Sequence, residues 1–372
     1  MKILVILQFW GTAGGTETLN RDTVQALKDL GHDVKILTLF GPDNAPPPEG
    51  VELESLFPRS RPARIVWWRF LWRLALAKRL QTSSKVYDWI IFGHVQLLEA
   101  VKHVRIAPAR SAIWVYGMDV WGQQAARRTR HLNKISKIIS ISDYTLSQLD
   151  LSDYPGEALV IPCCTRPEIF VPTSTPEKIR RNEILICGRM ASPQRSKGHD
   201  MLFKALPLAE RILGEPLRLR VSGTGPDQAR LEGLARELGV SDRVIFAGRL
   251  PLPELVEAYQ HCGAFCMPTP VTNYDPEFWN GEGFGIVYIE AASCGRPVIA
   301  SSEGGAPETI LPGETGLLVN PRSEREIAEA IATLLKNPES NDTMGTKGRE
   351  LVLERFTYET FKNNVSKMLS GK

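Results

Sequence analysis

The chain has 372 residues, of which 43% are hydrophobic and 23% are charged. This composition excludes a disordered or fibrous protein, and the length suits two α/β domains, each with its own core, better than one. The formal net charge is only +3, its positive excess lies in residues 1–180, and no nucleic-acid partner is expected.

The N-terminal residues enter a strand pattern directly, without the charged segment, apolar core and cleavage site of a secretion signal. No uncharged apolar stretch reaches the roughly 20 residues of a membrane-spanning helix. The six cysteines lie mostly in apolar runs and lack the spacing of a zinc site, as is typical of buried thiols in a reducing compartment. We therefore expect a cytoplasmic protein without a bound metal.

Strand and helix patterns alternate along the first half of the chain. Residues 3–7 form an apolar run typical of a buried parallel strand, and residues 16–30 follow with helical periodicity. Later apolar runs are separated by segments long enough for crossovers. Further strands are expected at residues 34–39, 89–92, 112–115 and 138–141. The alternation predicts a doubly wound parallel sheet.

Residues 59–80 combine arginines and lysines with tryptophans. Arginine beside tryptophan suits a surface that contacts anionic lipid, because the rings sit at the headgroup boundary and the cations meet phosphate. The amphipathic pattern is imperfect, however, since Leu76 and Leu80 fall near the helical sector of Arg69 and Arg73. Two interpretations stay open: peripheral contact with the inner face of the membrane, or an ordinary helix packed on the sheet.

A second series of strand patterns follows a segment of linker composition at residues 165–176. Its strands are expected at residues 184–187, 217–221, 244–247, 264–267 and 298–300. We therefore expect two Rossmann-like domains, residues 1–172 and 173–355, and a C-terminal helix in residues 356–372 that packs back on the first domain. Ligands of doubly wound sheets bind at the carboxyl ends of the strands, here in a central cleft between the domains.

Residues 280–292 hold the most informative motif, Asn-Gly-Glu-Gly-Phe-Gly-Ile-Val-Tyr-Ile-Glu-Ala-Ala. Gly283 and Gly285 let the backbone approach a ligand, and a helix that begins near Gly285 would direct free N–H groups at an anion. Glu282 and Glu290 would share one side of that helix if it extends far enough back. The apolar residues between them favour a ligand pocket over a solvated face.

A basic pair stands at the two ends of one strand-to-helix loop. Arg189 follows the strand that ends in Cys187-Gly188, and Lys197 precedes the next helix. An arginine grips phosphate oxygens through two parallel hydrogen bonds, and a lysine supplies a point charge. The pair predicts a clamp for a diphosphate. On the N-terminal side, Gly11-x-x-Gly14-Gly15 lacks the G-x-G-x-x-G spacing of a dinucleotide site, which disfavours a dehydrogenase.

These motifs resemble those of the retaining glycosyltransferases of family 4 (glycosyl transferases group 1), which have the GT-B fold. Glu282 and Glu290 match the family's Glu-x7-Glu motif, and Arg189 and Lys197 match its diphosphate clamp. The resemblance implies that the first domain binds the acceptor and the second binds a nucleotide sugar. Tyr116 stands where the family usually has a histidine.

The resemblance also assigns residues. Glu290 would bind the ribose, and Glu282 would bind the donor sugar. The implied catalytic residues are His94, Asp119, Arg189, Lys197 and Glu282. The implied donor-binding residues are Gly14, Gly15, Gly188, Gly223, Arg249, Leu250, Gly283, Phe284, Gly285, Ile286, Val287 and Glu290.

The implied reaction moves a hexosyl group from a nucleotide-diphosphate sugar to an acceptor hydroxyl, with retention and without a metal or cofactor. Residues 283–292 and 304–308 look closest to the family's lipid and envelope-glycan mannosyltransferases, which favours GDP-mannose over UDP-glucose or UDP-N-acetylglucosamine. The acceptor would be a glycan or a lipid-linked precursor. Two alternatives remain: a retaining glycosidase with Glu282 and Glu290 as its carboxylate pair, about 5 Å apart, or a non-catalytic carbohydrate-binding protein.

Overall fold

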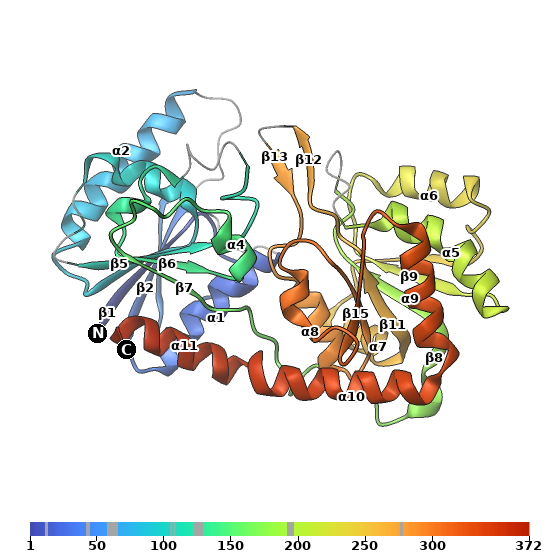
Figure 1. Ribbon diagram of the computed structural model, residues 1–372. Helices are drawn as coiled ribbons and strands as arrows, with labels where there is room; N and C mark the ends of the chain where they lie inside the picture. Colours follow the sequence, from blue (N-terminus) through green and yellow to red (C-terminus); the bar gives the residue numbers. More distant parts are fainter. Residues whose placement is uncertain are drawn as a thin grey trace. The chain divides into compact units, whose positions relative to one another are not determined.

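The computed structural model describes residues 1–11, 14–41, 45–57, 66–104, 106, 109–122, 129–191, 197–275 and 278–371. It divides into two compact units, of which the first comprises Met1–Cys163 with Glu359–Lys372 and the second Cys164–Tyr358. Each unit is a parallel sheet covered by helices (Figure 1). The prediction of two doubly wound α/β domains is confirmed.

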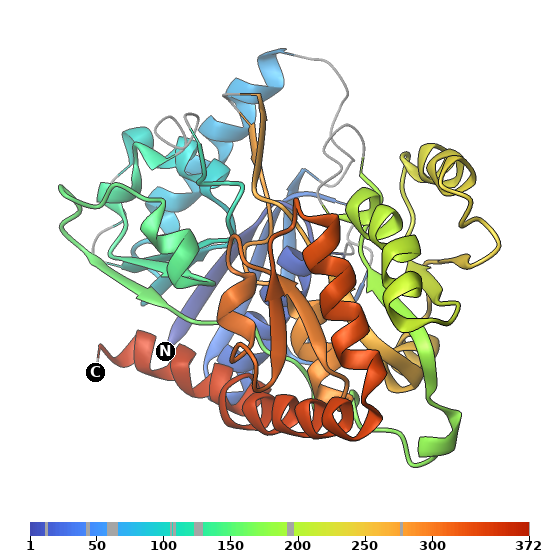
Figure 2. The same ribbon diagram turned by 45° about the vertical axis from the view of Figure 1, so that its right-hand side comes forward.

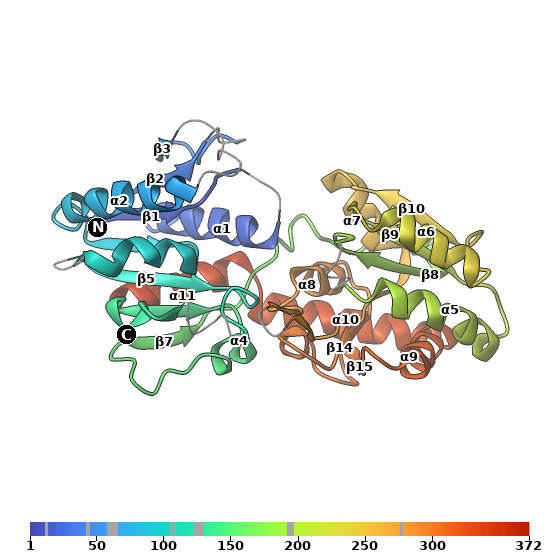
Figure 3. The same cartoon turned by 90° about the horizontal axis from the view of Figure 1, so that it is seen from above.

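The described part of the first unit contains a seven-stranded sheet with the order β3-β2-β1-β4-β5-β6-β7, which can be followed from β3 to β7 in Figure 3. Every neighbouring pair of strands is parallel. The strand order reverses direction between β1 and β4, which makes their carboxyl ends the expected place for a ligand. The strands are β1 (Lys2–Leu7), β2 (Asp33–Phe40), β3 (Glu52–Phe57), β4 (Trp89–Phe92), β5 (Arg110–Val115), β6 (Lys137–Ser140) and β7 (Glu157–Val160).

Helices connect these strands, and the C-terminal helix of the chain also packs on this sheet. The Phe361 ring of the last helix stacks on Trp114 of β5, with 6.0 Å between ring centroids, so this helix covers the first sheet (Figure 1). The helices of the unit are α1 (Gly15–Asp29), α2 (Val66–Ser83), η1 (Val95–His103), η2 (Leu132–Lys134), α4 (Asp143–Ser147) and α11 (Tyr358–Ser370).

The second unit repeats the same plan in its described residues, with the strand order β10-β9-β8-β11-β14-β15 and a reversal between β8 and β11. All of these pairings are parallel. The strands are β8 (Arg180–Cys187), β9 (Arg218–Ser222), β10 (Val244–Gly248), β11 (Cys262–Met267), β14 (Val298–Ser301) and β15 (Gly316–Val319). A separate antiparallel hairpin follows β11 and consists of β12 (Thr272–Asp275) and β13 (Phe278–Asn280).

Helices cover both faces of the second sheet. Helices α5 and α9 lie side by side on one face (Figure 2). Helix α8 contacts both α7 and α10 on the other face, as right-handed crossovers require. The helices are η3 (Pro176–Lys178), α5 (His199–Leu213), α6 (Gln228–Glu237), α7 (Leu252–His261), α8 (Ile286–Ser293), η4 (Ala306–Thr309), α9 (Glu324–Lys336) and α10 (Pro338–Arg355).

The division between the units falls between Cys163 and Cys164, ahead of the residue 172 that composition suggested. Residues 164–172 pack with the second unit because their backbone is bonded there. Ser293 Oγ donates to Phe170 O over 2.6 Å, and Thr165 N–H donates to Phe356 O over 2.8 Å.

Candidate functional site

Three glycine-containing loops meet at the carboxyl edge of the second sheet. Gly188 N–H donates to Ser222 O over 2.9 Å, and Gly223 N–H donates to Gly248 O over 2.7 Å, which continues the pairing of β8, β9 and β10 beyond their ends. Gly223 has a φ of 134°, and a Cβ there would lie 2.1 Å from Gly188 O. Only glycine fits, so the predicted Gly188 and Gly223 form one close-packed backbone surface.

Lys197 lies over the end of β8, because a Cβ on Gly188 would be 3.1 Å from Lys197 Cγ. Its Nζ is 2.6 Å from Glu282 Oε2. The next residue, Gly198, caps α5 with a φ of 76° and touches the backbone of Pro268, which directly follows β11. These contacts place Lys197 and Glu282 at the switch point between β8 and β11, where ligands of doubly wound sheets bind.

The segment around Gly283 is held by the turn that contains Gly305. Gly305 N–H donates to Glu282 O over 2.8 Å. A Cβ on Gly305 would lie 2.0 Å from Gly283 O, so the two backbones touch and position 305 does not tolerate a larger residue. The Phe284 ring is buried and packs edge-on against Phe356, with 5.6 Å between centroids. Residue 284 therefore has only its backbone to offer a ligand.

Helix α8 begins at Ile286, with Gly285 at its N-cap and a φ of 101°. Glu282 therefore lies before the helix, so the condition under which one helix would carry both glutamates on one side is not met. The left-handed conformation of Gly285, which lies between the two glutamates, keeps the helix from extending back to Glu282. The half-buried Ile286 and Val287 form the first turn, whose N–H groups have no partner within the helix and carry the positive end of its dipole.

Glu290 lies further along α8, close to the end of β8. Tyr259 of α7 donates its hydroxyl to Glu290 Oε2 over 2.9 Å. Burial raises the pKa of Glu290 to about 7, and the Tyr259 hydrogen bond opposes this shift. Burial, with the nearby Glu290 charge, also raises the pKa of the Cys187 thiol to about 11. Sequence reasoning missed Tyr259, because a tyrosine on the buried face of a helix carries no signal of a ligand site.

The predicted cations Arg189 and Arg249 stand at the same edge, since Arg189 follows Gly188 and Arg249 follows β10. Both side chains are exposed, and neither forms an ion pair with a residue that the structure describes. Leu250 is half-buried. Unpaired guanidinium groups at this edge are available to an anionic ligand.

A second cluster lies at the carboxyl edge of the first sheet. Asp119 is buried, and its Oδ1 accepts the Tyr116 N–H over 3.0 Å. Burial raises the pKa of Asp119, and the charge of the nearby His94 opposes this shift. His94 Nδ1 accepts the Gln96 N–H over 3.1 Å, so the neutral ring carries its proton on Nε2.

Tyr116 joins three elements of this unit. Its hydroxyl lies 2.9 Å from Asn20 Oδ1 of α1 and 2.9 Å from Gly93 O at the end of β4. Asn20 was not predicted from the sequence. The tyrosine at this position therefore ties β5 to α1 and to the residue preceding His94. Gly14 and Gly15 are exposed where α1 begins, and Gly14 has a φ of 150°.

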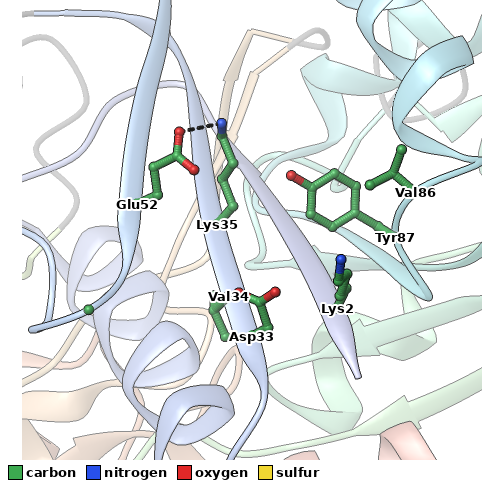
Figure 4. Close-up of a pocket in the computed structure, with 8 residues that line it drawn as sticks. Lys2, Asp33, Val34, Lys35, Glu52, Val86 and Tyr87 are labelled. Atoms are coloured by element: carbon green, nitrogen blue, oxygen red, sulfur yellow. Dashed lines mark hydrogen bonds and ion pairs between the residues drawn. The ribbon is translucent and has the colours of Figure 1, made fainter.

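A pocket of about 290 Å³ in the first unit lies elsewhere (Figure 4). It opens at the amino ends of β1, β2 and β3, where Lys35 Nζ is 2.6 Å from Glu52 Oε1. Its lining residues are Lys2, Asp33, Val34, Lys35, Gly50, Glu52, Val86 and Tyr87. None of the predicted site residues lines it, because they all stand at or after the carboxyl ends of strands.

Helix α2 shows a mixed surface in its described side chains. Leu76 and Leu80 are fully buried, whereas Leu71 and Leu74 are each 50% exposed. Arg79 pairs with Glu54 over 2.7 Å. The expected basic residues 59, 61 and 64, and the side chains of residues 67–69, lie outside the described residues. Within the described chain, no helix is long and apolar enough to cross a membrane.

Solved glycosyltransferases share this architecture along the whole chain. Sucrose-phosphate synthase from Thermosynechococcus elongatus aligns with a TM-score of 0.80 and 23% identity, covering 100% of this chain and 99% of its own. The Anabaena HepE protein in complex with UDP aligns with a TM-score of 0.78 and 21% identity, covering 100% of both chains. The paired parallel-sheet units thus define the GT-B fold.

Sequence comparison gives the family. The model "Glycosyl transferases group 1" matches residues 172–351, and "Glycosyltransferase Family 4" matches residues 13–168. A GDP-mannose-dependent α-(1-6)-phosphatidylinositol monomannoside mannosyltransferase of Mycolicibacterium smegmatis is 30% identical over 280 residues, which cover 72% of each chain. The chain belongs to glycosyltransferase family 4, as its motifs predicted.

Proposed function

We propose that this glycosyltransferase moves a hexosyl group from a nucleotide-diphosphate sugar to an acceptor hydroxyl, with retention of configuration and without a metal or cofactor. GDP-mannose is the favoured donor, because the M. smegmatis relative is named as GDP-mannose-dependent. UDP-glucose and UDP-N-acetylglucosamine are the next candidates, since HepE was crystallised with UDP.

The contact between Lys197 and Glu282 carries this proposal. It places a cation and a carboxylate at the β8–β11 switch point, beside the backbone of residues 283–287. Lys197, Arg189 and the N-terminus of α8 would stabilise the negative charge that grows on the departing diphosphate. Glu282 would accept hydrogen bonds from the donor sugar, and Glu290 would accept them from the ribose.

The first unit would bind the acceptor. His94, Asp119 and the Gly14-Gly15 turn stand at the carboxyl edge of its sheet, where they would face the transferred sugar and the acceptor hydroxyl. In this mechanism no side chain acts as a nucleophile. The leaving phosphate oxygen would take the acceptor's proton.

The proposed acceptor is a glycan or lipid-linked precursor of a cell-envelope polysaccharide or glycolipid, used at the cytoplasmic face of the membrane. The half-exposed Leu71 and Leu74 on the basic helix α2 support peripheral contact with that surface. The name of the M. smegmatis relative, whose acceptor is a phosphatidylinositol mannoside, points in the same direction.

A panel of nucleotide sugars tests the proposal. Binding and slow hydrolysis of GDP-mannose, UDP-glucose and UDP-N-acetylglucosamine are measured with the wild-type chain and with Lys197→Ala. We expect one donor to be selected and its turnover to depend on Lys197. Hydrolysis of a simple glycoside without nucleotide would instead identify a glycosidase. Donor binding without turnover, even with candidate acceptors, would identify a binding protein.

A further inference from the structure

Arg230 in the first turns of α6 holds two carboxylates at once. Its Nη1 and Nη2 donate to Asp200 Oδ1 and Oδ2 over 2.5 and 2.8 Å. Its Nε and Nη2 donate to Asp227 Oδ1 and Oδ2 over 2.8 and 2.5 Å. A guanidinium that grips two carboxylates through paired hydrogen bonds fixes their relative positions more tightly than a single ion pair does.

Each carboxylate is connected to one end of the loop that carries the predicted diphosphate clamp. Asp200 is in the first turn of α5, directly after Lys197-Gly198-His199. Asp227 N–H donates to Met190 O over 3.2 Å, and Met190 directly follows Arg189. Arg230 is therefore connected to Lys197 through Asp200 and to Arg189 through Asp227 and Met190.

Close backbone packing makes this connection stiff. Met190 N–H donates to Thr224 O over 3.2 Å. A Cβ on Gly225 would lie only 1.9 Å from Met190 O, so the loops after β8 and β9 touch without intervening side chains. A displacement of Asp227 would be passed directly to the backbone beside Arg189.

We propose that Arg230 is a positioning residue of the donor site: through Asp200 and Asp227 it fixes the spacing of Lys197 and Arg189 to match the two phosphates of the donor. The inference rests on the proposed function, since it assigns a diphosphate to this loop. This role needs no contact between Arg230 and the substrate. The effect of Arg230 comes from holding Lys197 and Arg189 in place before the donor binds, which lowers the entropic cost of ordering them on binding.

The β-phosphate contribution to binding separates this role from general stabilisation of the fold. We define it as the ratio of the Kd of the nucleoside monophosphate to that of the diphosphate, measured by calorimetry with GMP and GDP or with UMP and UDP. A fold-stabilising arginine would change the melting temperature and leave this ratio constant. A positioning arginine would change the ratio itself, well below the melting temperature.

Arg230→Met keeps the length of the side chain and removes its four hydrogen bonds. We expect the ratio to fall about tenfold, the equivalent of one charge-assisted hydrogen bond. The matched control is Arg243→Met. Arg243 has a similar exposed fraction, 26% against 29%, and pairs with Glu210 over 2.6 Å, but it precedes β10 at the opposite edge of the sheet. Its ratio should equal that of the wild type.

Asp200→Asn provides a second test should Arg230→Met fail to fold. It retains the side-chain shape and weakens one half of the connection, so the ratio should fall severalfold, and an unchanged ratio would overturn the inference. Where Arg230→Met folds, the two effects should combine less than additively. An unchanged ratio in folded Arg230→Met, or an equal fall in Arg243→Met, would overturn the inference alone. If the wild-type chain binds neither GDP nor UDP, the proposed function fails and the inference fails with it.

Discussion

The ammonium group of Lys197 lies 2.6 Å from the Oε2 atom of Glu282, at the switch point of the second sheet. Both side chains are mostly buried, with exposed fractions of 24% and 15%, so each compensates the charge of the other at a moderate desolvation cost. A donor diphosphate would compete with Glu282 for the lysine. Binding of the diphosphate to Lys197 would then free the Glu282 carboxylate to accept hydrogen bonds from the donor sugar. A single exchange of partners would therefore ready both side chains for their roles.

Replacement of Lys197 tests the first half of this exchange. Lys197→Ala should lower kcat by several hundredfold or more, on the order of 3 to 4 kcal/mol, because a preoriented cation is lost from the leaving group. Steady-state turnover of the selected donor measures the effect. Lys204→Ala is the control, since Lys204 lies in α5, the helix that Lys197 precedes, and pairs at 3.5 Å with Glu324. Near-normal turnover of Lys197→Ala would refute the clamp.

Replacement of Glu282 should separate binding from turnover. Glu282→Gln removes the charge that competes for Lys197, so the bare nucleoside diphosphate should bind at least as tightly as to the wild type. Turnover should nevertheless fall by about tenfold or more, because a charge-assisted hydrogen bond to the sugar is lost. Calorimetry and initial rates measure the two effects. Weaker nucleotide binding with normal turnover would contradict the exchange of partners.

Much of the fold was predictable because most strands of both sheets are short apolar runs. Residues 89–92 were predicted to the residue, and the other predicted strands were found within a few residues of their bounds. Three sheet strands, β3, β7 and β15, escaped prediction, and all three lie at sheet edges. In β3 and β7 the side chains are exposed or half-buried, so neither strand has a continuous apolar run.

The candidate site was less predictable, since contacts between distant residues depend on how the loops pack. The Glu-x7-Glu spacing suggested a shared helical face, whereas Gly285 separates Glu282 from the helix. No sequence pattern indicated that Lys197 pairs with Glu282 or that Tyr259 donates to Glu290. The glycines were more informative. A positive φ at Gly223 and Gly285 demands that residue, and both positions were singled out.

If Glu290 binds the ribose as proposed, its raised pKa should make nucleotide binding depend on pH. Its carboxyl group is neutral well below pH 7 and ionised above it. Since an ionised carboxylate accepts stronger hydrogen bonds from ribose hydroxyls, GDP affinity should rise severalfold between about pH 6 and pH 8. Glu290→Gln should bind more weakly at pH 8. Subtracting the pH profile of Glu290→Gln from that of the wild type removes the contribution of the titrating phosphates of GDP. Identical pH profiles for the two proteins would exclude the ribose role.

The same shift affects stability with a defined sign. The folded pKa of about 7 lies above the ordinary value of 4.5, so the folded protein holds the proton more tightly than the unfolded chain does. This contribution is complete below pH 4.5 and is lost as the pH rises through about 7. Glu290→Gln should therefore lose less stability than the wild type between pH 4.5 and 7.5, as measured by urea unfolding. If the wild type loses no more stability over this pH range than Glu290→Gln does, the raised pKa of Glu290 is contradicted.

The exposed leucines of α2 provide the test of membrane contact. Leu71 and Leu74 are each 50% exposed, on a helix that also carries Arg73 and Lys78. If they enter the headgroup region, the double variant Leu71→Ser, Leu74→Ser should bind vesicles containing phosphatidylglycerol about thirtyfold more weakly, because each half-exposed leucine loses on the order of 1 kcal/mol of burial. Sedimentation with vesicles measures this, and binding should also weaken with added salt. Leu353→Ser is the matched control, since Leu353 is 48% exposed on α10 in the second unit. Equal sedimentation of all three proteins would leave α2 as a helix that only packs on its sheet.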